Sequence, residues 1–305
     1  MIALLVCLTL GADAYGFSGG VAPLRGASSD PKWAACEKCH ARVALEHAGS
    51  QHAQASTHPL YAQAYRLEPS ALCRNCHDPL GGDAGITCAV CHVREGVVLG
   101  ARAAPRAPHP VRVDPGLKSE LCAGCHEFPF AVPRGKGFVL VDAPMQSTFS
   151  EWRKVDARPD AACTTCHLKA GHAFPGGHDP ALVRRSLEVQ LVGGELLLST
   201  IGVGHRFPTG DVFRRLMVEV SEPGGRWRRV GSLGRRFEGV NLVEDTSLEP
   251  GAVRRLALGE VTPLSRLRLR YLYAPPTHFL ERSVPVADLS SIILEEDLAK
   301  LRGAP

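Results

Sequence analysis

C-E-K-C-H at residues 36–40 is the first of five copies of one pattern, which returns as C-R-N-C-H (73–77), C-A-V-C-H (88–92), C-A-G-C-H (122–126) and C-T-T-C-H (163–167). In this pattern two thiols form thioether bonds to the vinyl groups of a porphyrin, and the histidine that follows becomes the proximal iron ligand. The five copies therefore predict five covalently attached haem c groups.

The residues of the motifs divide by role. The cysteines expected to carry the porphyrins are Cys36, Cys39, Cys73, Cys76, Cys88, Cys91, Cys122, Cys125, Cys163 and Cys166. The expected proximal iron ligands are His40, His77, His92, His126 and His167. Because the eleventh cysteine, Cys7, lies in an N-terminal apolar run, we expect no thiol for disulfides or nucleophilic chemistry, and no catalytic residue is assigned.

Paired cysteines also occur in zinc sites, redox-active dithiols and structural disulfides. A zinc ribbon needs two Cys-x-x-Cys pairs about 15 to 20 residues apart, and the pairs that begin at Cys73 and Cys88 have roughly that spacing. None of these alternatives requires a histidine after every pair. Haem attachment is therefore the favoured interpretation.

The N-terminal residues 2–12, I-A-L-L-V-C-L-T-L-G-A, are apolar and run into Ala12-Asp13-Ala14, which fits the small-x-small pattern of signal peptidase. We expect residues 1–14 to be a signal peptide cleaved after Ala14; the usual basic start is missing, and a buried helix is the alternative. Covalent haem attachment takes place outside the cytoplasmic membrane, so the expected location is periplasmic or extracellular. No other stretch approaches the roughly 18 apolar residues of a membrane span.

Composition changes near residue 180, and this change predicts an α+β chain of two domains. Residues 15–180 contain every motif and too few residues per motif to enclose each haem separately, so we expect a mostly helical, loop-rich domain with the haems as its core. Residues 181–283 contain no cysteine and alternate in stretches such as S-L-E-V-Q-L-V and R-L-R-L-R-Y-L-Y, which predicts an antiparallel β-sandwich-like domain. Residues 284–305 are expected to form an amphipathic C-terminal helix and tail.

The sixth iron ligand decides between electron transfer and catalysis. Eight of the thirteen histidines lie outside the motifs, which is enough for five distal positions, whereas only Met145 or Met217 offers methionine ligation after the initiator. The expected distal ligands are His52, His58, His109, His172 and His205. His178 competes with His172, and His47 and His278 are expected to be ordinary surface histidines.

A short motif occurs twice around two of these histidines, as G-H-A-F-P-G-G (171–177) and G-H-R-F-P-T-G (204–210). Rigid proline and permissive glycine suit a loop that holds an imidazole against a flat porphyrin. If His205 ligates iron, the β-domain is clamped to the haem domain through that bond.

The motifs and the segments between them resemble those of a known group of cytochromes. The chain is similar to multihaem cytochromes related to the tetrahaem cytochromes of ammonia oxidisers and to the haem modules of octahaem reductases. The similar segments are C-E-K-C-H with E-H-A-G-S-Q-H-A-Q-A, C-R-N-C-H-D-P, C-A-V-C-H, C-A-G-C-H-E-F with M-Q-S-T-F-S-E-W, and C-T-T-C-H before G-H-A-F-P-G-G-H. The resemblance covers about residues 33–215. It implies a mostly helical haem domain, bis-histidine ligation at most sites and His52 as a distal ligand. The β-domain departs from the small soluble members.

The formal net charge is only +4, so strong attraction to nucleic acid is not expected. Arginine outnumbers lysine seventeen to one after residue 180, and these arginines are expected to lie on a solvated sheet face, to pair with haem propionates or to dock an acidic partner.

The favoured function is electron transfer by an exported pentahaem cytochrome between redox proteins, such as a quinol-linked donor and a terminal reductase. An electron carrier is favoured over a catalyst. Two alternatives stay open: a reductase with one open haem for nitrite, hydroxylamine or a sulfur oxyanion, and a homo-oligomeric cytochrome wire.

Overall fold

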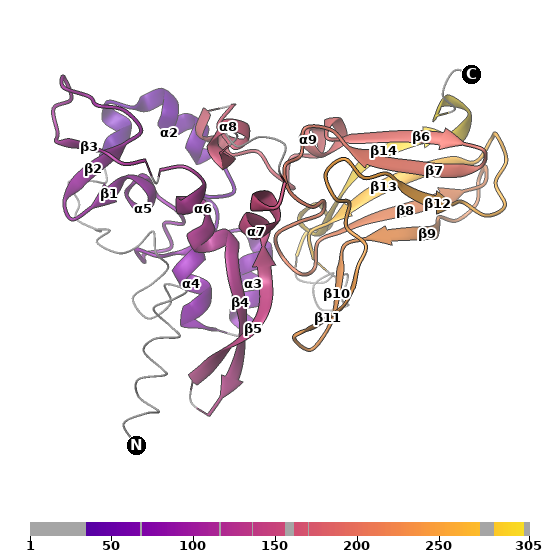
Figure 1. Ribbon diagram of the computed structural model, residues 1–305, viewed down its shortest axis with the longest axis horizontal. Helices are drawn as coiled ribbons and strands as arrows, with labels where there is room; N and C mark the ends of the chain where they lie inside the picture. Colours follow the sequence, from indigo (N-terminus) through magenta and orange to yellow (C-terminus); the bar gives the residue numbers. More distant parts are fainter. Residues whose placement is uncertain are drawn as a thin grey trace. The chain divides into compact units, whose positions relative to one another are not determined.

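The computed structural model describes residues 35–67, 69–115, 117–135, 137–155, 162–169, 171–274 and 284–301. These residues form two compact units, whose helices and strands are labelled in Figure 1. The first unit contains the described residues up to Asp142 and those from 162 to Pro175; the second contains 143–155 and the described residues from Gly176 onward. The expected signal peptide, Cys7 and His278 lie outside the described residues.

The first unit carries the five motifs on short helices. These are a 3-10 turn η3 (Cys36–Lys38) and α2 (Ala41–Ala48), α3 (Pro59–Leu67), α4 (Ala71–His77), α5 (Cys88–His92), α6 (Ser119–His126), α8 (Cys163–His167) and η4 (Gly171–Ala173). The motif histidine is the last residue of α4, α5, α6 and α8. Helix α4 begins where Ser70 caps it, because the Ser70 hydroxyl accepts a hydrogen bond from the Leu72 amide at 3.3 Å.

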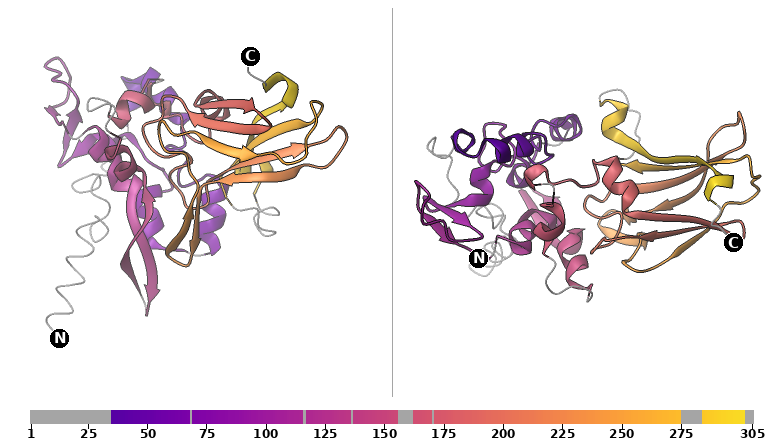
Figure 2. Two further views of the ribbon diagram at one scale, coloured as in Figure 1. Left: turned by 45° about the vertical axis from the view of Figure 1, so that its right-hand side comes forward. Right: turned by 90° about the horizontal axis from the view of Figure 1, so that it is seen from above.

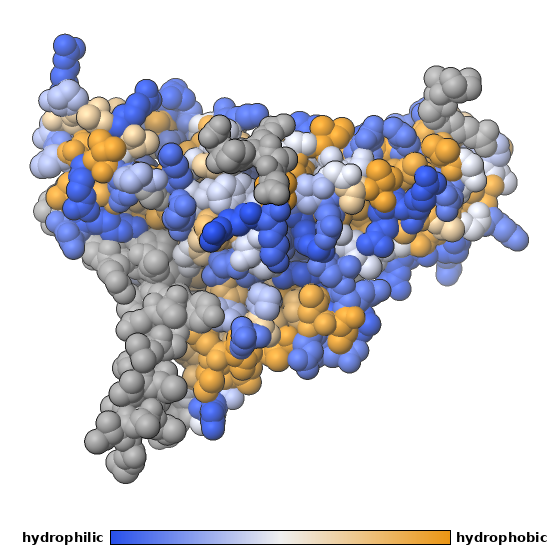
Figure 3. Space-filling view, viewed as in Figure 1, coloured by the Kyte–Doolittle hydropathy of each residue, from blue (hydrophilic) through white to orange (hydrophobic). Residues whose placement is uncertain are grey.

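The first unit also contains strands, which the expectation of a mostly helical domain did not include. A small sheet joins β1 (Val93–Arg94), β2 (Val97–Gly100) and β3 (Val111–Val113), and a hairpin joins β4 (Glu127–Arg134) to β5 (Gly137–Ser147). Exposed apolar side chains, among them Phe138, gather over this hairpin (Figure 3). The two units divide within β5, between Asp142 and Ala143.

The second unit is built on antiparallel sheets. Its elements are α7 (Thr148–Arg153), α9 (Pro180–Arg185), β6 (Leu187–Val192), β7 (Glu195–Thr200), β8 (Arg215–Ser221), β9 (Arg228–Leu233), β10 (Arg235–Glu238), β11 (Asn241–Asp245), β12 (Arg254–Ala257), β13 (Arg266–Leu272), α11 (Val286–Leu289), β14 (Ser290–Asp297) and η5 (Leu298–Leu301). The strand orders are β12-β7-β6, β14-β13-β8-β9 and β10-β11. The prediction of an α+β chain with antiparallel sheets is confirmed.

Alternation along these strands makes the core of the second unit. Leu196 and Leu198 on β7 and Leu267 and Leu269 on β13 are 0% exposed, whereas the residues between them are partly exposed. A period of two is what a strand with one buried face requires. Figure 2 shows the larger sheets of this unit as layers.

The expectation of a C-terminal helix over residues 284–305 was wrong for most of the described part of this segment. Residues Ser290–Asp297 form β14, an edge strand paired antiparallel to β13, and only the short α11 precedes it. Ile292 and Ile293 are β-branched and favour a strand. The acidic end of β14 pairs with the arginines of β13, as in the ion pair of Arg266 with Glu295 at 2.7 Å. Hydrogen bonding to β13 therefore decides that this segment is a strand, although the spacing of its apolar residues also fits a helix.

The division between the units also differs from the expected boundary at 180. Residues 143–155, which precede the last haem motif, belong to the second unit. The second unit is therefore discontinuous in the sequence. No helix within the described ranges is long and apolar enough to cross a bilayer.

Candidate haem-binding sites

Three motif histidines have the same hydrogen bond to the backbone. Nδ1 of His77, His92 and His167 lies 2.9 Å from the carbonyl oxygens of Ala55, Leu99 and Pro175, respectively. A histidine that ligates a metal through Nε2 usually donates its Nδ1–H to such an acceptor, which fixes the tautomer and the orientation of the ring. These contacts therefore fix the ring orientation of three of the five motif histidines, in the way expected of proximal ligands.

His52 and the motif histidine His126 are paired in the first unit. Their ring centroids are 6.3 Å apart. An imidazole nitrogen binds a first-row metal at about 2 Å, so two imidazoles on opposite sides of one metal have ring centres about 6 Å apart. Burial lowers the pKa of His52 to about 4, with His126 as the next cause, so His52 stays neutral, the form that binds iron.

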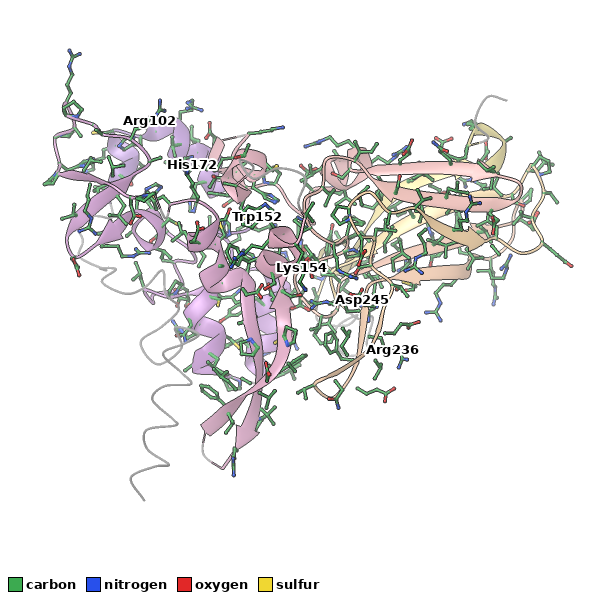
Figure 4. All side chains as sticks on the ribbon, viewed as in Figure 1. Arg102, Trp152, Lys154, His172, Arg236 and Asp245 are labelled. Carbon is green, nitrogen blue, oxygen red and sulfur yellow. The ribbon has the colours of Figure 1, made fainter. Side chains whose placement is uncertain are left out.

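His172 and the motif histidine His92 form a second pair of this kind, with centroids 6.2 Å apart. His172 is labelled in Figure 4. Its backbone amide donates to the Glu46 carboxylate at 3.0 Å. Burial, followed by the nearby His92, lowers the pKa of the His172 ring, which favours the neutral form.

Glycines and an aromatic ring hold these two candidate distal ligands. Gly171 has a positive φ, and a side chain there would strike the Glu46 carboxylate. Gly85 also has a positive φ, and a Cβ there would lie 2.6 Å from the Ala53 carbonyl oxygen, so only glycine allows this approach beside His52. The Phe174 ring lies edge-on to His52 at 4.8 Å and to His172 at 5.7 Å.

The sequence did not single out Glu46 or Gly85, and it gave no separate role to Phe174, which belongs to the G-H-A-F-P-G-G motif. Glu46 lies 126 residues before the amide that it holds, so no local spacing connects the two. The only local signal was the C-E-K-C-H to E-H-A-G-S-Q-H segment, in which Glu46 stands six residues before His52.

The structure places the other three expected distal ligands in different surroundings. The His58 Nδ1 lies 3.3 Å from the Leu60 amide, which places His58 at the start of α3. His109 lies between β2 and β3, and its Nδ1 is buried without a hydrogen-bond partner in the described residues. His205 belongs to the second unit, where its Nδ1 lies 2.8 Å from the Arg206 carbonyl oxygen. Ligation by these three stays a prediction.

His178 and His47 form contacts with groups other than a histidine ring. The Nε2 of His178 lies 3.1 Å from the Arg214 guanidinium, and its ring stacks on Tyr273 at 4.0 Å. Nε2 of His47 lies 2.8 Å from the Ile86 carbonyl oxygen. The contact of His178 favours His172 over His178 as the ligand from this segment.

Motif thiols from different helices lie close together. The Cys88 thiol lies near that of Cys36, the Cys125 thiol near that of Cys76 and the Cys163 thiol near that of Cys122. The Cys163 amide also donates to the Ser119 hydroxyl at 3.0 Å, which ties α8 to the start of α6. All ten described cysteines are thiols rather than disulfides. Porphyrins bound at these sulfurs would share one crowded region.

These residues fit haem on two observations: the histidine pairs at about 6 Å and the Nδ1 contacts of the motif histidines. Within the described ranges, no three His, Cys, Asp or Glu side chains gather closely enough to hold a bare metal ion. A haem iron needs only two protein ligands, because the porphyrin supplies the other four.

The second G-H-x-F-P segment is anchored inside the second unit. Arg235 is 6% exposed and donates to the Gly210 carbonyl oxygen at 2.6 Å, to the Met145 carbonyl oxygen at 3.1 Å and to the Ser147 hydroxyl at 3.2 Å. The Thr209 hydroxyl bonds to the buried Glu151 carboxylate. The M-Q-S-T-F-S-E-W segment therefore holds the loop that carries His205.

Comparisons with family models, with curated proteins and with solved structures find no match to this chain. The functional assignment therefore depends on the motifs and on the geometry of the histidines.

Proposed function

We propose that the chain is a pentahaem c-type cytochrome that transfers electrons through five covalently bound haems with mostly bis-histidine ligation. The observation that carries the proposal is the pairing of two motif histidines, His126 and His92, with His52 and His172 at the separation that a shared iron requires. The five Cys-x-x-Cys-His motifs supply the covalent attachment.

The protein residues have distinct tasks in this proposal. The motif cysteines anchor the porphyrins, and backbone carbonyl groups orient the proximal rings. Burial keeps His52 and His172 neutral, so that each presents a lone pair. When bound, haem supplies reversible one-electron chemistry at iron, and two histidine ligands favour electron transfer because they leave no open position for a substrate.

Location and partners follow as parts of the same proposal. Haem attachment to Cys-x-x-Cys-His takes place after export, so the protein works in the periplasm or outside the cell. Its partners are redox proteins, with a quinol-linked donor on one side and a terminal reductase or extracellular acceptor on the other. No residue has to act as a general acid or base.

The test combines haem counting with spin state. A pyridine haemochrome assay and the intact mass of the purified protein should give five covalent haems, and low-temperature electron paramagnetic resonance of the oxidised protein should give low-spin iron throughout. A large high-spin signal that changes on adding nitrite or hydroxylamine would favour a reductase instead. Fewer than five haems on the fully matured protein would contradict the proposal.

The mass of the protein in solution tests the alternative of a homo-oligomeric cytochrome wire. A cytochrome wire requires each subunit to complete its neighbour, so its mass rises with concentration. A constant monomer mass in analytical ultracentrifugation at high concentration excludes the wire and leaves electron transfer by the single chain.

A further inference from the structure

A cavity of about 390 Å³ opens in the second unit, away from every haem motif in the sequence. It lies where β8 and β9 meet the β10–β11 hairpin, and its lining includes Arg215, Arg229, Arg236, Glu244, Ser232 and Thr246. Three arginines and one glutamate thus line the same cavity. The sequence shows many arginines after residue 180, but it does not show which of them lie close together in the fold.

Arg215 has no carboxylate partner among the described residues. Its guanidinium donates only to the carbonyl oxygens of Val212 and Arg214, at 3.3 and 3.0 Å. Burial lowers the pKa of Arg215 and the positive charge of Arg235 lowers it further, while the carboxylates of Glu244 and Asp245 oppose this shift without cancelling it. A half-buried cation whose hydrogen-bond acceptors are neutral carbonyl groups attracts an anion, because the nearby carboxylates of Glu244 and Asp245 act on it only through space and form no ion pair with it among the described residues.

Gly234 makes room for this guanidinium. Its φ is +143°, and a Cβ there would lie 2.6 Å from the Arg214 carbonyl oxygen and 2.8 Å from the Arg215 Nη1. The turn between β9 and β10 therefore requires glycine, and its missing side chain leaves the Arg215 head group at the cavity.

The other two arginines differ in how far they are neutralised. Arg236, labelled in Figure 4, already pairs with Glu238 at 2.9 Å and with Glu244 at 3.4 Å. Arg229, on β9, pairs with no carboxylate in the part of the chain that the structure describes, and it is exposed. Arg215 and Arg229 are therefore the two arginines of the cavity that form no ion pair with a carboxylate in the described residues.

The size and lining of the cavity limit what it can hold. Its volume lies in the range of small-molecule sites, about 300 to 1,000 Å³. None of the described side chains that line it is aromatic, so it offers no surface on which a nucleobase or sugar could stack. Serine and threonine hydroxyls beside two arginines suit oxygen atoms that carry negative charge.

We propose that this cavity binds a small multivalent oxyanion, an inorganic phosphate or an aliphatic dicarboxylate, held by Arg215 and Arg229. Arginine presents a planar fork of N–H donors that matches both kinds of oxyanion. The site would make the Cys-free unit a ligand-binding module rather than only a support for the haem motifs.

The experiment titrates potassium phosphate and, separately, potassium succinate into the full-length haem-loaded protein by isothermal titration calorimetry, with ionic strength held constant by potassium chloride. We expect saturable binding of one equivalent in at least one of the two titrations. Binding of phosphate alone identifies an inorganic ligand class, and binding of succinate alone identifies a carboxylate class.

Two variants localise the site, and a third is the matched control. Arg215→Gln and Arg229→Gln should each weaken binding about tenfold or more, because each removes charge-assisted hydrogen bonds. Arg229 is exposed, so its variant stays informative if Arg215→Gln does not fold. Arg255→Gln removes the same charge from an exposed arginine on β12, 3.2 Å from Glu195, and should leave affinity within about twofold.

Three results would overturn the inference. The first is no saturable heat with either anion up to about 10 mM. The second is unchanged affinity in Arg229→Gln. The third is an equal loss in Arg255→Gln, because the binding would then reflect the general positive charge of the unit.

Discussion

His52 is held by segments that lie far from it in the sequence. Its carbonyl oxygen accepts a hydrogen bond from the Ile86 amide at 2.9 Å, and its ring lies near His126 and Phe174. In the proposed cytochrome, a side chain this enclosed would reach only one iron. We infer that His52 serves the fourth motif and His172 the third, an assignment that depends on the separation of ring centres.

Replacing His52 or His172 should change the spin state of one of the five proposed haem irons. We expect His52→Ala and His172→Ala to keep all five covalent haems, because the motif cysteines are untouched, and each to convert one low-spin iron to high-spin. Electron paramagnetic resonance of the oxidised variants measures this change, and added imidazole should restore the low-spin signal.

His178→Ala is the control for that pair of variants. It removes an imidazole from the same segment as His172, but its Nε2 lies against Arg214 rather than a motif histidine. Its spectrum should match that of the unaltered protein. A high-spin iron in His178→Ala, together with none in His172→Ala, would reverse the assignment.

Glu219 shows how one buried carboxylate supports the sheet. Its side chain is 8% exposed and accepts hydrogen bonds from Arg268 and Arg270, each at 2.8 Å. Burial alone would raise the pKa of Glu219, but the hydrogen bonds from Arg270 and Arg268 outweigh it and lower the pKa below its usual value. The charged form is therefore favoured by folding.

Glu219→Gln should lower the free energy of unfolding by about 2 kcal/mol, because it leaves two partly buried guanidinium groups without their carboxylate. A carboxyl with a depressed pKa contributes stability above its unfolded pKa of about 4.3, and loses that contribution as pH falls through the folded value. The difference between the two proteins should therefore be largest near neutral pH and shrink below about pH 4.

Urea denaturation at several pH values measures this difference. Glu238→Gln removes an exposed carboxylate from its pair with Arg236 and should cost less than about 0.5 kcal/mol. An equal effect of the two substitutions, or a difference that grows in acid, would contradict the role assigned to Glu219.

At the scale of elements, Arg235 joins β10 to two segments that are distant in the sequence. Its donors reach the Gly210 carbonyl oxygen in the G-H-R-F-P-T-G loop and the Met145 carbonyl oxygen and Ser147 hydroxyl at the end of β5. Loops without regular pairing need such partners, because their backbone carbonyl groups are otherwise left to water.

Arg235→Ala should destabilise the second unit by about 3 kcal/mol, because three acceptors lose a buried charged donor. The loop 204–210 should also lose protection of its amides in hydrogen exchange followed by mass spectrometry. Arg236→Ala, one residue along and exposed, is the control and should leave both quantities nearly unchanged.

The sequence predicted the elements of this molecule unevenly, for identifiable reasons. Alternation of buried leucines such as Leu267 and Leu269 marked the strands, because each strand carries its own pattern. The segment of Ile292 and Ile293 was predicted as a helix, because its apolar spacing fits both periods and only pairing with β13 decides between them. The contact of Glu46 with the His172 amide joins residues 126 positions apart, so no local spacing in the sequence predicts it.

At the scale of the whole chain, the second unit is assembled from two stretches of sequence. Residues 143–155 lie ahead of the last haem motif, yet they supply Met145, Ser147 and Glu151 to the network around Arg235 and Thr209. The change in composition near residue 180 could not reveal this, because composition follows the chain and not its contacts.

This discontinuity predicts how fragments behave. A fragment of residues 176–305 lacks Met145 and Ser147, which accept hydrogen bonds from Arg235, and Glu151, which accepts one from Thr209. Its free energy of unfolding should therefore fall by about 3 kcal/mol relative to a single-chain version that carries residues 143–155 on a flexible linker. Adding a synthetic peptide of residues 143–155 should restore stability to the shorter fragment, whereas the same peptide with Glu151→Ala and Ser147→Ala should not. Urea denaturation followed by circular dichroism reads out both effects without any haem. Equal stability of the two fragments would mean that residues 176–305 form a complete folding unit, and that residues 143–155 rest on that unit without holding it together.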